Sequence, residues 1–465
     1  MVAVAANGLV AGAGDHGIHE VFVAAAGGSD AFAGDLLHGA ARRHPTVVFA
    51  LLAALRRLAD SRWIGLGGVL LGWFGTGVAV GALSRALGAP RSSWLWAAVA
   101  TAPAQLALGG APTLDPLLLP RGVALPVELF ALVFLVRARW APAFALGGLS
   151  LLLHAPSGSV VLVGLVAAWL PGRQSRSAPL WALLGAIPAA LLAQPALGGL
   201  FPPDLWPALQ ARLAHHLLPL SFPATSWGVA AVWSAAALRS SRGHPLMGRF
   251  VFGVLGWALL AGALGPALRV TLLLNLEPWQ ALRVIVVLGP TLLLASPALT
   301  HRSRLLLGAA LLALCVWAAP APWRAAPADV VALGRWAHQS TPPGAIFVLP
   351  PDLPPGFRPA AQRPTFGTWK DGGELQFDPD LGREWVRRMG VLCECAPIIE
   401  APVRPEAEVF ARSRSGAARL GAAFDARSDA DLLRLAAAEG AAYVVRRGPG
   451  PGEVVGPFRV LNAPP

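Results

Sequence analysis

The chain has 465 residues, of which 55% are hydrophobic and only 13% are charged. About a quarter of the residues of an ordinary soluble domain are charged, so this composition argues against a soluble protein and predicts an integral membrane protein. The formal net charge is +12, but most arginines stand in short clusters between apolar runs, a pattern typical of cytoplasmic loops, and we discount nucleic-acid binding.

The first part of the chain, residues 1–45, predicts an extracytoplasmic loop. Its opening, MVAVAANGLVAGAG, has no basic residue ahead of the apolar ones and is too short to cross a membrane. It is typical of the tail of a truncated first membrane helix that begins upstream. The loop then gathers acidic and imidazole side chains, namely Asp15, His16, His19, Glu20, Asp30 and Asp35.

Two interpretations fit this acidic loop. In the first, the carboxylate of Asp15 or Asp35 acts as a general base or holds a divalent cation, because Mg²⁺ and Mn²⁺ prefer oxygen ligands. In the second, Asp15 and Asp35 cap helices, and the histidines, including His19, are solvated. The spacing of these residues is not that of a closed zinc site.

The middle of the chain, residues 46–320, predicts a multi-span transmembrane bundle. Residues 46–60 are expected to lie on the membrane surface as an amphipathic helix, and about ten apolar runs of spanning or nearly spanning length follow. These runs cover residues 64–83, 93–109, 122–136, 140–153, 158–171, 178–197, 222–238, 250–268, 282–299 and 304–320.

Arginine clusters in alternate loops set the expected orientation. By the positive-inside rule their side is the cytoplasm, and the loops between them, with everything after residue 320, are extracytoplasmic. The strong excess of arginine over lysine is typical of a GC-rich bacterial genome, so we expect a bacterial inner membrane. The clusters are Arg85 and Arg91, Arg137 and Arg139, Arg173 and Arg176, Arg239, Arg242 and Arg249, and Arg302 and Arg304.

Some polar groups stand at the outer ends of the predicted helices. His154 and Arg283 are either functional groups or side chains that reach back to the membrane surface, and Glu277 is a candidate partner for Arg283. The stretch PPDLWPALQARLAHHLLPLSFP, residues 202–223, predicts a helix lying at the membrane interface rather than a metal site.

The last part of the chain, residues 321–465, predicts an extracytoplasmic α/β domain. Residues 328–339 have the pattern of an amphipathic helix, AIFVLPP and AAYVVRR that of buried strands, and SDADLLRLAAAEG that of a capped helix. A disulfide between residues two apart would be strained, so Cys393 and Cys395 are expected to be free thiols or a weak redox pair.

The only lysine of the chain, Lys370, stands in the loop-rich stretch FGTWKDGGELQF. Arginine forks and a compact ammonium are natural partners of phosphate oxygens, and aromatic faces suit sugar rings or a headgroup boundary. The same cations could instead pair with nearby acidic residues. The cations and aromatic residues concerned are Arg358, Arg363, Lys370, Arg387 and Arg388, with Phe357, Trp369 and Trp385.

A multi-span bundle with an acidic first outer loop and an outer α/β domain resembles the GT-C superfamily of polyprenyl-phosphate-dependent glycosyltransferases. The segments LGRWAHQSTPPGAIFVLPPD, GFRPAAQRPTFGTWKDG, EWVRRM and LAAAEGAAYVV, with LLHAPSG and LEPWQALRV, are similar to an uncharacterised bacterial branch of it. The resemblance implies that a first-loop carboxylate, Asp15 or Asp35, is the base or metal ligand. It also implies that cations near the outer membrane face bind the lipid-linked phosphate, here Arg283, Arg358, Arg363, Lys370 and Arg388.

The sequence therefore predicts an inverting glycosyltransferase that moves a sugar from a polyprenyl-phosphate carrier to an extracytoplasmic acceptor. A compact ammonium beside two glycines suits Lys370 to a phosphate. The main alternative is a non-catalytic envelope protein that binds lipid-linked glycan carriers, and a transporter is a third interpretation. His19, His154 and Trp369 are further candidates for the site.

Overall fold

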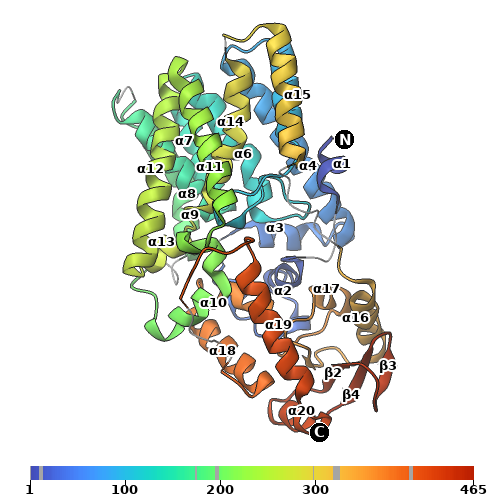
Figure 1. Cartoon of the computed structure of the whole chain (residues 1–465). Helices are drawn as coiled ribbons and strands as arrows, with labels where there is room; N and C mark the ends of the chain where they lie inside the picture. Colours follow the sequence, from blue (N-terminus) through green and yellow to red (C-terminus); the bar gives the residue numbers. More distant parts are fainter. Residues whose placement is uncertain are drawn as a thin grey trace.

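The computed structural model describes residues 2–9, 14–44, 46–172, 175–193, 198–296, 298–317, 325–396 and 402–464. Arg173 and most of the proline-rich junction before residue 325 lie outside these ranges. Figure 1 shows a bundle of long helices at one end of the molecule and the C-terminal helices and strands at the other. The short helices of the first loop lie between them.

The first loop is mostly helical. Its elements are α1 (Val2–Asn7), α2 (His16–Ala26), η1 (Asp30–Phe32), η2 (Ala40–Arg42) and α3 (Val48–Leu55). The amide of Asn7 donates to the carbonyl of Ala102 at 2.8 Å and accepts from the backbone of Ala104 at 2.7 Å, which fastens α1 to the bundle. Asp15 precedes α2, but its side chain makes no capping hydrogen bond.

A helix occupies each of the expected apolar runs. Only Trp63–Ala86 and Pro245–Leu268 are both long and apolar enough to cross a membrane by length and composition, so ten full spans are not supported among the described residues. The helices are α4 (Ser61–Ala86), α5 (Arg91–Ala100), α6 (Pro120–Val136), α7 (Trp140–Leu153), α8 (Ala155–Trp169), α9 (Leu183–Ala193), α11 (Ala224–Ser240), α12 (Pro245–Leu268), α14 (Arg283–Ala295) and α15 (His301–Trp317).

The bundle helices are apolar on their outer faces as well as inside. Leu71 and Phe74 of α4 are 70% and 71% exposed, and Phe252 of α12 is 73% exposed. Small residues allow close packing within the bundle, since a Cβ atom on Gly185 would lie 2.0 Å from the carbonyl oxygen of Gly148. An apolar exterior around a tightly packed interior is what a lipid environment favours.

The first loop, α10 and the C-terminal region share one hydrophobic core. Phe22 of α2, Leu209 of α10 and Trp385 of α18 are completely or almost completely buried in it. Helix α10 spans Trp206–Leu217, and Arg212 and His215 on its buried face are 5% and 3% exposed. The prediction of a helix lying on the membrane surface is therefore wrong for α10, which packs between protein layers.

The C-terminal region combines helices with a small sheet, as expected from the sequence. The sheet order is β1-β2-β4-β3, with β1 and β2 parallel and the other pairs antiparallel. The elements are α16 (Ala328–Ser340), β1 (Phe347–Val348), α17 (Phe357–Ala361), η10 (Trp369–Glu374), α18 (Pro379–Cys393), α19 (Ala411–Ala426), α20 (Asp429–Ala438), β2 (Tyr443–Arg447), β3 (Glu453–Val455) and β4 (Phe458–Asn462).

The two cysteines of the C-terminal region, Cys393 and Cys395, form a disulfide. The expectation of free thiols is therefore wrong, and that of a weak redox pair stays a prediction. Glu394, between them, ends α18 in a left-handed conformation, and this turn brings the two sulfur atoms together.

A buried arginine joins the first loop to the C-terminal region. Arg358 donates from Nε to Asp35 Oδ2 at 2.7 Å and from Nη1 to Asp371 Oδ1 at 2.7 Å. Its Nη2 also bonds to the hydroxyl of Thr365 at 2.6 Å. Both carboxylates are fully enclosed, so their charges depend on this guanidinium for compensation.

We predict that Arg358→Ala lowers the free energy of unfolding by about 3–5 kcal/mol, because it leaves two buried carboxylates without their cation. Thermal unfolding of the detergent-purified protein, followed by tryptophan fluorescence, measures the effect. Arg434→Ala is the control, since the Arg434 side chain is 78% exposed and surface ion pairs of this kind contribute little to stability. Equal effects of the two substitutions would contradict the prediction.

Candidate functional site

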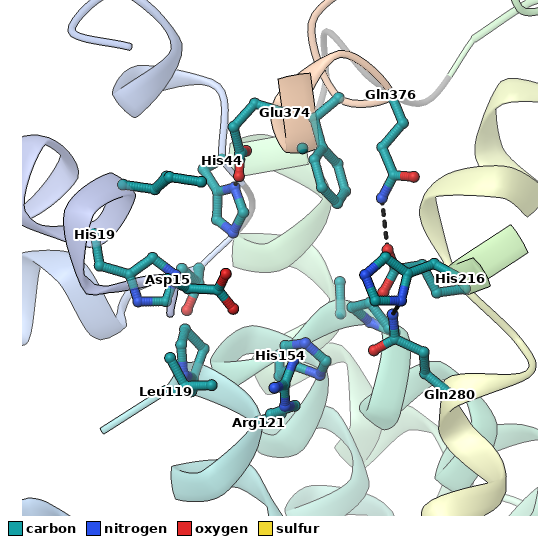
Figure 2. A pocket seen from close by; sticks show the side chains of 18 of the residues that line it. Asp15, His19, His44, Leu119, Arg121, His154, His216, Gln280, Glu374 and Gln376 are labelled. Atoms are coloured by element: carbon teal, nitrogen blue, oxygen red, sulfur yellow. Dashed lines mark hydrogen bonds and ion pairs between the residues drawn. The ribbon is translucent and has the colours of Figure 1, made fainter. Parts of the chain in front are cut away.

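A polar cavity lies where the bundle, the first loop and the C-terminal region meet (Figure 2). The space in it that a water-sized molecule can occupy is about 130 Å³, which is less than the roughly 300–1,000 Å³ typical of small-molecule sites, and the cavity opens to solvent. Its polar lining residues are Asp15, His19, His44, Thr46, Arg121, His154, Arg212, His216, Glu277, Gln280, Lys370, Glu374 and Gln376.

The ion pair between Asp15 and Lys370 is the central contact of this cavity. Lys370 Nζ lies 2.6 Å from Asp15 Oδ1, and the two side chains are 36% and 26% exposed. Burial alone would raise the pKa of Asp15, but the charges of Lys370 and Arg121 outweigh it and hold that pKa well below its usual range. Asp15 is therefore an ionised carboxylate at neutral pH and a weak proton acceptor.

The backbone that carries Lys370 is held from two sides. Arg212 of α10 donates to the carbonyl oxygens of Trp369 at 3.0 Å and Lys370 at 3.1 Å. Thr368 and Asp371 form a capping box at the start of η10, which fixes the turn in which Lys370 stands. A Cβ atom on Gly372 would approach the indole of Trp385 to 2.5 Å, so a glycine permits this close packing.

Arg121 brings a second cation to the cavity from the first turn of α6. Its Nε and Nη2 atoms bind the carboxylate of Asp115, with Nη2 at 2.7 Å from Oδ1. No described hydrogen bond uses Nη1. The guanidinium is thus anchored on one side and has a donor left for a ligand.

Four histidines line the cavity, namely His19, His44, His154 and His216, and the last three are held by hydrogen-bonding neighbours. His44 Nδ1 lies 3.1 Å from Glu374 Oε2, and His154 Nδ1 lies 2.8 Å from the hydroxyl of Ser157. His216 Nδ1 lies 2.6 Å from the carbonyl oxygen of Gly109. Burial lowers the pKa of both His19 and His216 to about 3, so these two imidazoles are neutral at pH 7.

Glu277 is a carboxylic acid of a different kind in the same cavity. It accepts a 2.6 Å hydrogen bond from Gln376 Nε2 and is 9% exposed. Its expected pairing with Arg283 is wrong, because Arg283 pairs with Glu128 at 3.2 Å inside the bundle. Burial raises the pKa of Glu277 to about 7, although the Gln376 hydrogen bond and the charge of Arg121 act in the opposite direction.

The structure brings four of the sequence candidates to this cavity and places others elsewhere. Asp15, His19, His154 and Lys370 line it. Asp35 does not, because its carboxylate is enclosed by Arg358 and the backbone of Thr365. Some of the charged residues that the sequence predicts for the site therefore line the cavity, and others belong to the buried ion-pair network of Arg358.

The other arginine candidates have structural partners. Arg363 is 6% exposed and donates to the carbonyl oxygens of Thr341 at 2.7 Å and His338 at 3.0 Å. Arg388 binds Glu384 at 2.7 Å and the carbonyl of Phe366 at 2.8 Å. None of these contacts faces the lining of the cavity, so neither guanidinium is placed to meet a ligand there.

Arg283 and Trp369 also lie behind the cavity wall. Arg283 is 1% exposed and donates to the carbonyl of Arg121 at 2.7 Å, so it supports the residue that does line the cavity. The indole of Trp369 packs on Trp385 with ring centroids 5.2 Å apart and donates to Ser413 at 3.1 Å.

Several lining residues were not identified from the sequence as site residues. Arg121 falls in a predicted outer loop, and the sequence pattern places Arg212 and His216 on a predicted interfacial helix. Gln376 is uncharged and matches no motif. They come from α6, from α10 and from the segment after η10, so only the folded chain reveals that they converge.

A divalent cation does not fit the residues around Asp15. Its carboxylate is already in contact with an ammonium group, which repels a metal ion, and the second expected ligand, Asp35, is bound by Arg358. Within the described ranges, no group of three or more His, Cys, Asp or Glu side chains is arranged to hold a metal. We derive no step through a metal ion.

Residues 328–392 match a family model described as a domain of unknown function, DUF6798. The matched segment covers well under half of the chain and includes Lys370, Glu374 and Gln376 of the cavity wall. No curated protein and no solved structure matches the chain significantly.

The low pKa values of the cavity histidines predict that acid destabilises the protein. Folding lowers the pKa of His216 from 6.5 to about 3, so the unfolded chain binds a proton that the folded chain does not. This stability is present above pH 6.5 and is lost as the pH falls towards 3. Between pH 7 and pH 5 the loss is at most about 2 kcal/mol for this imidazole.

We therefore expect His216→Asn to reduce the fall in the thermal unfolding midpoint between pH 7 and pH 5. His301→Asn is the control, because His301 is exposed at the start of α15. Unfolding midpoints measured in detergent at several pH values test the prediction. An unchanged pH dependence in His216→Asn would show that this imidazole titrates normally.

Proposed function

We propose that the protein is a membrane glycosyltransferase of the GT-C type, which transfers a sugar from a polyprenyl-phosphate carrier to an extracytoplasmic acceptor. In this proposal the bundle α4–α15 lies in the bacterial inner membrane. The apolar outer faces of α4 and α12 support a lipid-facing bundle, because exposed residues such as Leu71 and Phe252 would otherwise meet water. Helices that are too short to cross the membrane alone would have their backbone polar groups enclosed by neighbouring helices.

Two further observations support an extracytoplasmic cavity. The disulfide of Cys393 and Cys395 is typical of oxidising compartments. Arg239 and Arg242 stand at the α11–α12 junction, at the end of the bundle away from the C-terminal region (Figure 1). By the positive-inside rule that end would face the cytoplasm.

The observation that carries the proposal is the Asp15–Lys370 pair in a cavity between the bundle and the C-terminal region. Lys370 and Arg121 supply an ammonium and a guanidinium donor in the cavity at the end of the proposed membrane bundle. Both groups suit phosphate oxygens. A lipid-linked phosphate would reach them with its chain still among the helices.

The proposed reaction is a displacement at the anomeric carbon. The acceptor hydroxyl gives its proton to a base and forms the new C–O bond, the bond between the anomeric carbon and the phosphate oxygen breaks, and the configuration is inverted. Lys370 and Arg121 neutralise the charge that develops on the leaving phosphate. Asp15, held ionised, places a negative charge beside the sugar ring, where positive charge develops as the bond breaks.

A second candidate is a non-catalytic protein that binds lipid-linked glycan carriers. The contact between Asp15 and Lys370 favours this candidate, because a carboxylate held in an ion pair is less able to act on a substrate. Both candidates bind the carrier phosphate, but only the enzyme transfers the sugar. Transfer from a radiolabelled polyprenyl-phosphate sugar, measured beside binding, separates the two.

Lys370→Ala should weaken binding of a short-chain polyprenyl phosphate to the detergent-purified protein. The loss of one charge-assisted hydrogen bond, about 1.5–3 kcal/mol, corresponds to a roughly ten- to hundredfold higher Kd. Arg434→Ala removes an exposed cation far from the cavity and should leave the Kd unchanged. Binding that is unaffected in Lys370→Ala would place the phosphate elsewhere, and no saturable binding by the wild type would overturn both candidates.

Asp15→Asn should lower sugar transfer by at least about tenfold, the effect of losing some 1.4 kcal/mol of transition-state stabilisation. The amide keeps the size of the side chain and removes its charge. Binding of the polyprenyl phosphate should be retained or become tighter, because Lys370 is released from its partner. Transfer at a near-normal rate in this variant would show that the Asp15 charge is not needed.

A further inference from the structure

The cavity has two chemically different ends (Figure 2). Asp15 and His19 lie at one end, and Gln376, His216 and Gln280 at the other. The first end carries the ion pair with Lys370. The second is built from amides, a neutral imidazole and the carboxyl group of Glu277, groups that recognise hydroxyls rather than phosphates.

Glu277 is held in an unusual way at this second end. Its backbone adopts a left-handed conformation with φ 41°, a costly geometry for a residue other than glycine, and such strain clusters at functional sites. Two backbone bonds fix the turn, from Glu277 to the carbonyl of Leu274 and from Gln280 to the carbonyl of Glu277. The carboxyl group forms no ion pair with any described cation.

The partner of Glu277 has an unused hydrogen-bonding atom. Gln376 is 1% exposed, and while its Nε2 donates to Glu277, its Oε1 is buried without a hydrogen-bond partner. A buried acceptor left unpaired costs free energy, so it calls for a donor that the protein does not supply. A hydroxyl of a bound molecule beside Glu277 would provide that donor.

We propose that Glu277, positioned by Gln376, is the proton acceptor for the acceptor hydroxyl in the reaction proposed above, on which this inference rests. The hydroxyl oxygen forms its bond to the anomeric carbon and gives its proton to the Glu277 carboxylate. The electron pair of the broken bond leaves with the phosphate oxygen at the Lys370 end. The substrate at the Glu277 end is therefore a neutral molecule bearing hydroxyl groups.

The charged groups around Glu277 agree with this role. Burial raises the pKa of its carboxyl to about 7, and the nearby charge of Glu374 acts in the same direction, while Gln376, Arg121 and His44 lower the pKa. Asp15, in contact with Lys370, has a pKa far below its usual range. Two carboxyl groups whose pKa values are driven apart in one site indicate different roles, and the one near 7 is suited to proton transfer.

The test compares sugar transfer by the wild type, Glu277→Gln and the control Glu453→Gln across pH. Glu453 is an exposed residue on β3, away from the cavity. We expect wild-type kcat to rise with pH and level off above about 7, because the carboxyl must be ionised to accept a proton. Glu277→Gln should lower kcat by roughly 10²–10⁴-fold and abolish that rise, with the Kd for polyprenyl phosphate little changed.

A spectroscopic readout accompanies the kinetics. Infrared difference spectra should show a protonated carboxyl that titrates near neutral pH in the wild type and in Glu453→Gln and is absent from Glu277→Gln. Gln376→Leu, which removes the hydrogen bond, should move that titration to higher pH, because the Gln376 bond lowers the pKa of Glu277. A residue that is merely structural would not cause this movement.

The outcomes separate the two proposals. If the wild type binds polyprenyl phosphate and transfers sugar, but Glu277→Gln keeps its kcat and its pH profile, the assignment of the proton acceptor is overturned and the proposed function stands. The assignment is also overturned if the wild-type spectra show no carboxyl group that titrates near neutral pH. If the wild type neither binds the carrier phosphate nor transfers sugar, the proposed function fails and the role of Glu277 falls with it.

Discussion

The buried guanidinium of Arg358 is the contact on which the geometry of the cavity depends. It binds Asp35 of the first loop and Asp371 of the C-terminal region at the same time. Asp371 follows Lys370 directly in the chain, so the position of the lysine is coupled to the position of the first loop. Arg43 also binds Asp378 at 2.7 Å across the same two segments, but the Arg43 side chain is 42% exposed, whereas the Arg358 bridge is buried.

Burial has opposite consequences at the two ends of the cavity because the neighbouring charges differ. At one end Lys370 and Arg121 compensate Asp15, and the carboxylate stays ionised despite its partial burial. At the other end Glu277 has an uncharged partner, Gln376, and the cost of burying a charge is only partly offset. A single cavity thus contains one acid that stays ionised and one that exchanges a proton near neutral pH.

The sequence predicted the features that depend on local patterns. Apolar runs identified the positions of the bundle helices, and the composition after residue 320 identified the α/β region. Lys370 stands out because it is the only lysine of the chain, whereas Asp15 belongs to an acidic first loop and is singled out, with Asp35, by the resemblance. The resemblance to glycosyltransferases contributed the idea that a first-loop acid and an outer cation act together, which the local pattern of either segment does not contain.

The sequence could not predict which charges pair. Arg358 and Arg363 look equivalent in the chain, yet Arg358 pairs with two buried carboxylates and Arg363 donates to backbone carbonyl oxygens. These outcomes depend on contacts between distant segments, such as Asp35 with Arg358. Glu277 was missed for the same reason, since its partner Gln376 is an uncharged residue almost a hundred positions away.

These pairings also explain why a lysine suits position 370. Arg212 already binds the carbonyl oxygens of Trp369 and Lys370, so the backbone is fixed and the side chain alone decides what meets the cavity. A guanidinium would hold a carboxylate through two parallel bonds, whereas an ammonium binds Asp15 through one atom and keeps other protons for a second partner. Lys370 therefore keeps protons for a second partner while it binds Asp15, which is what the proposed phosphate binding requires.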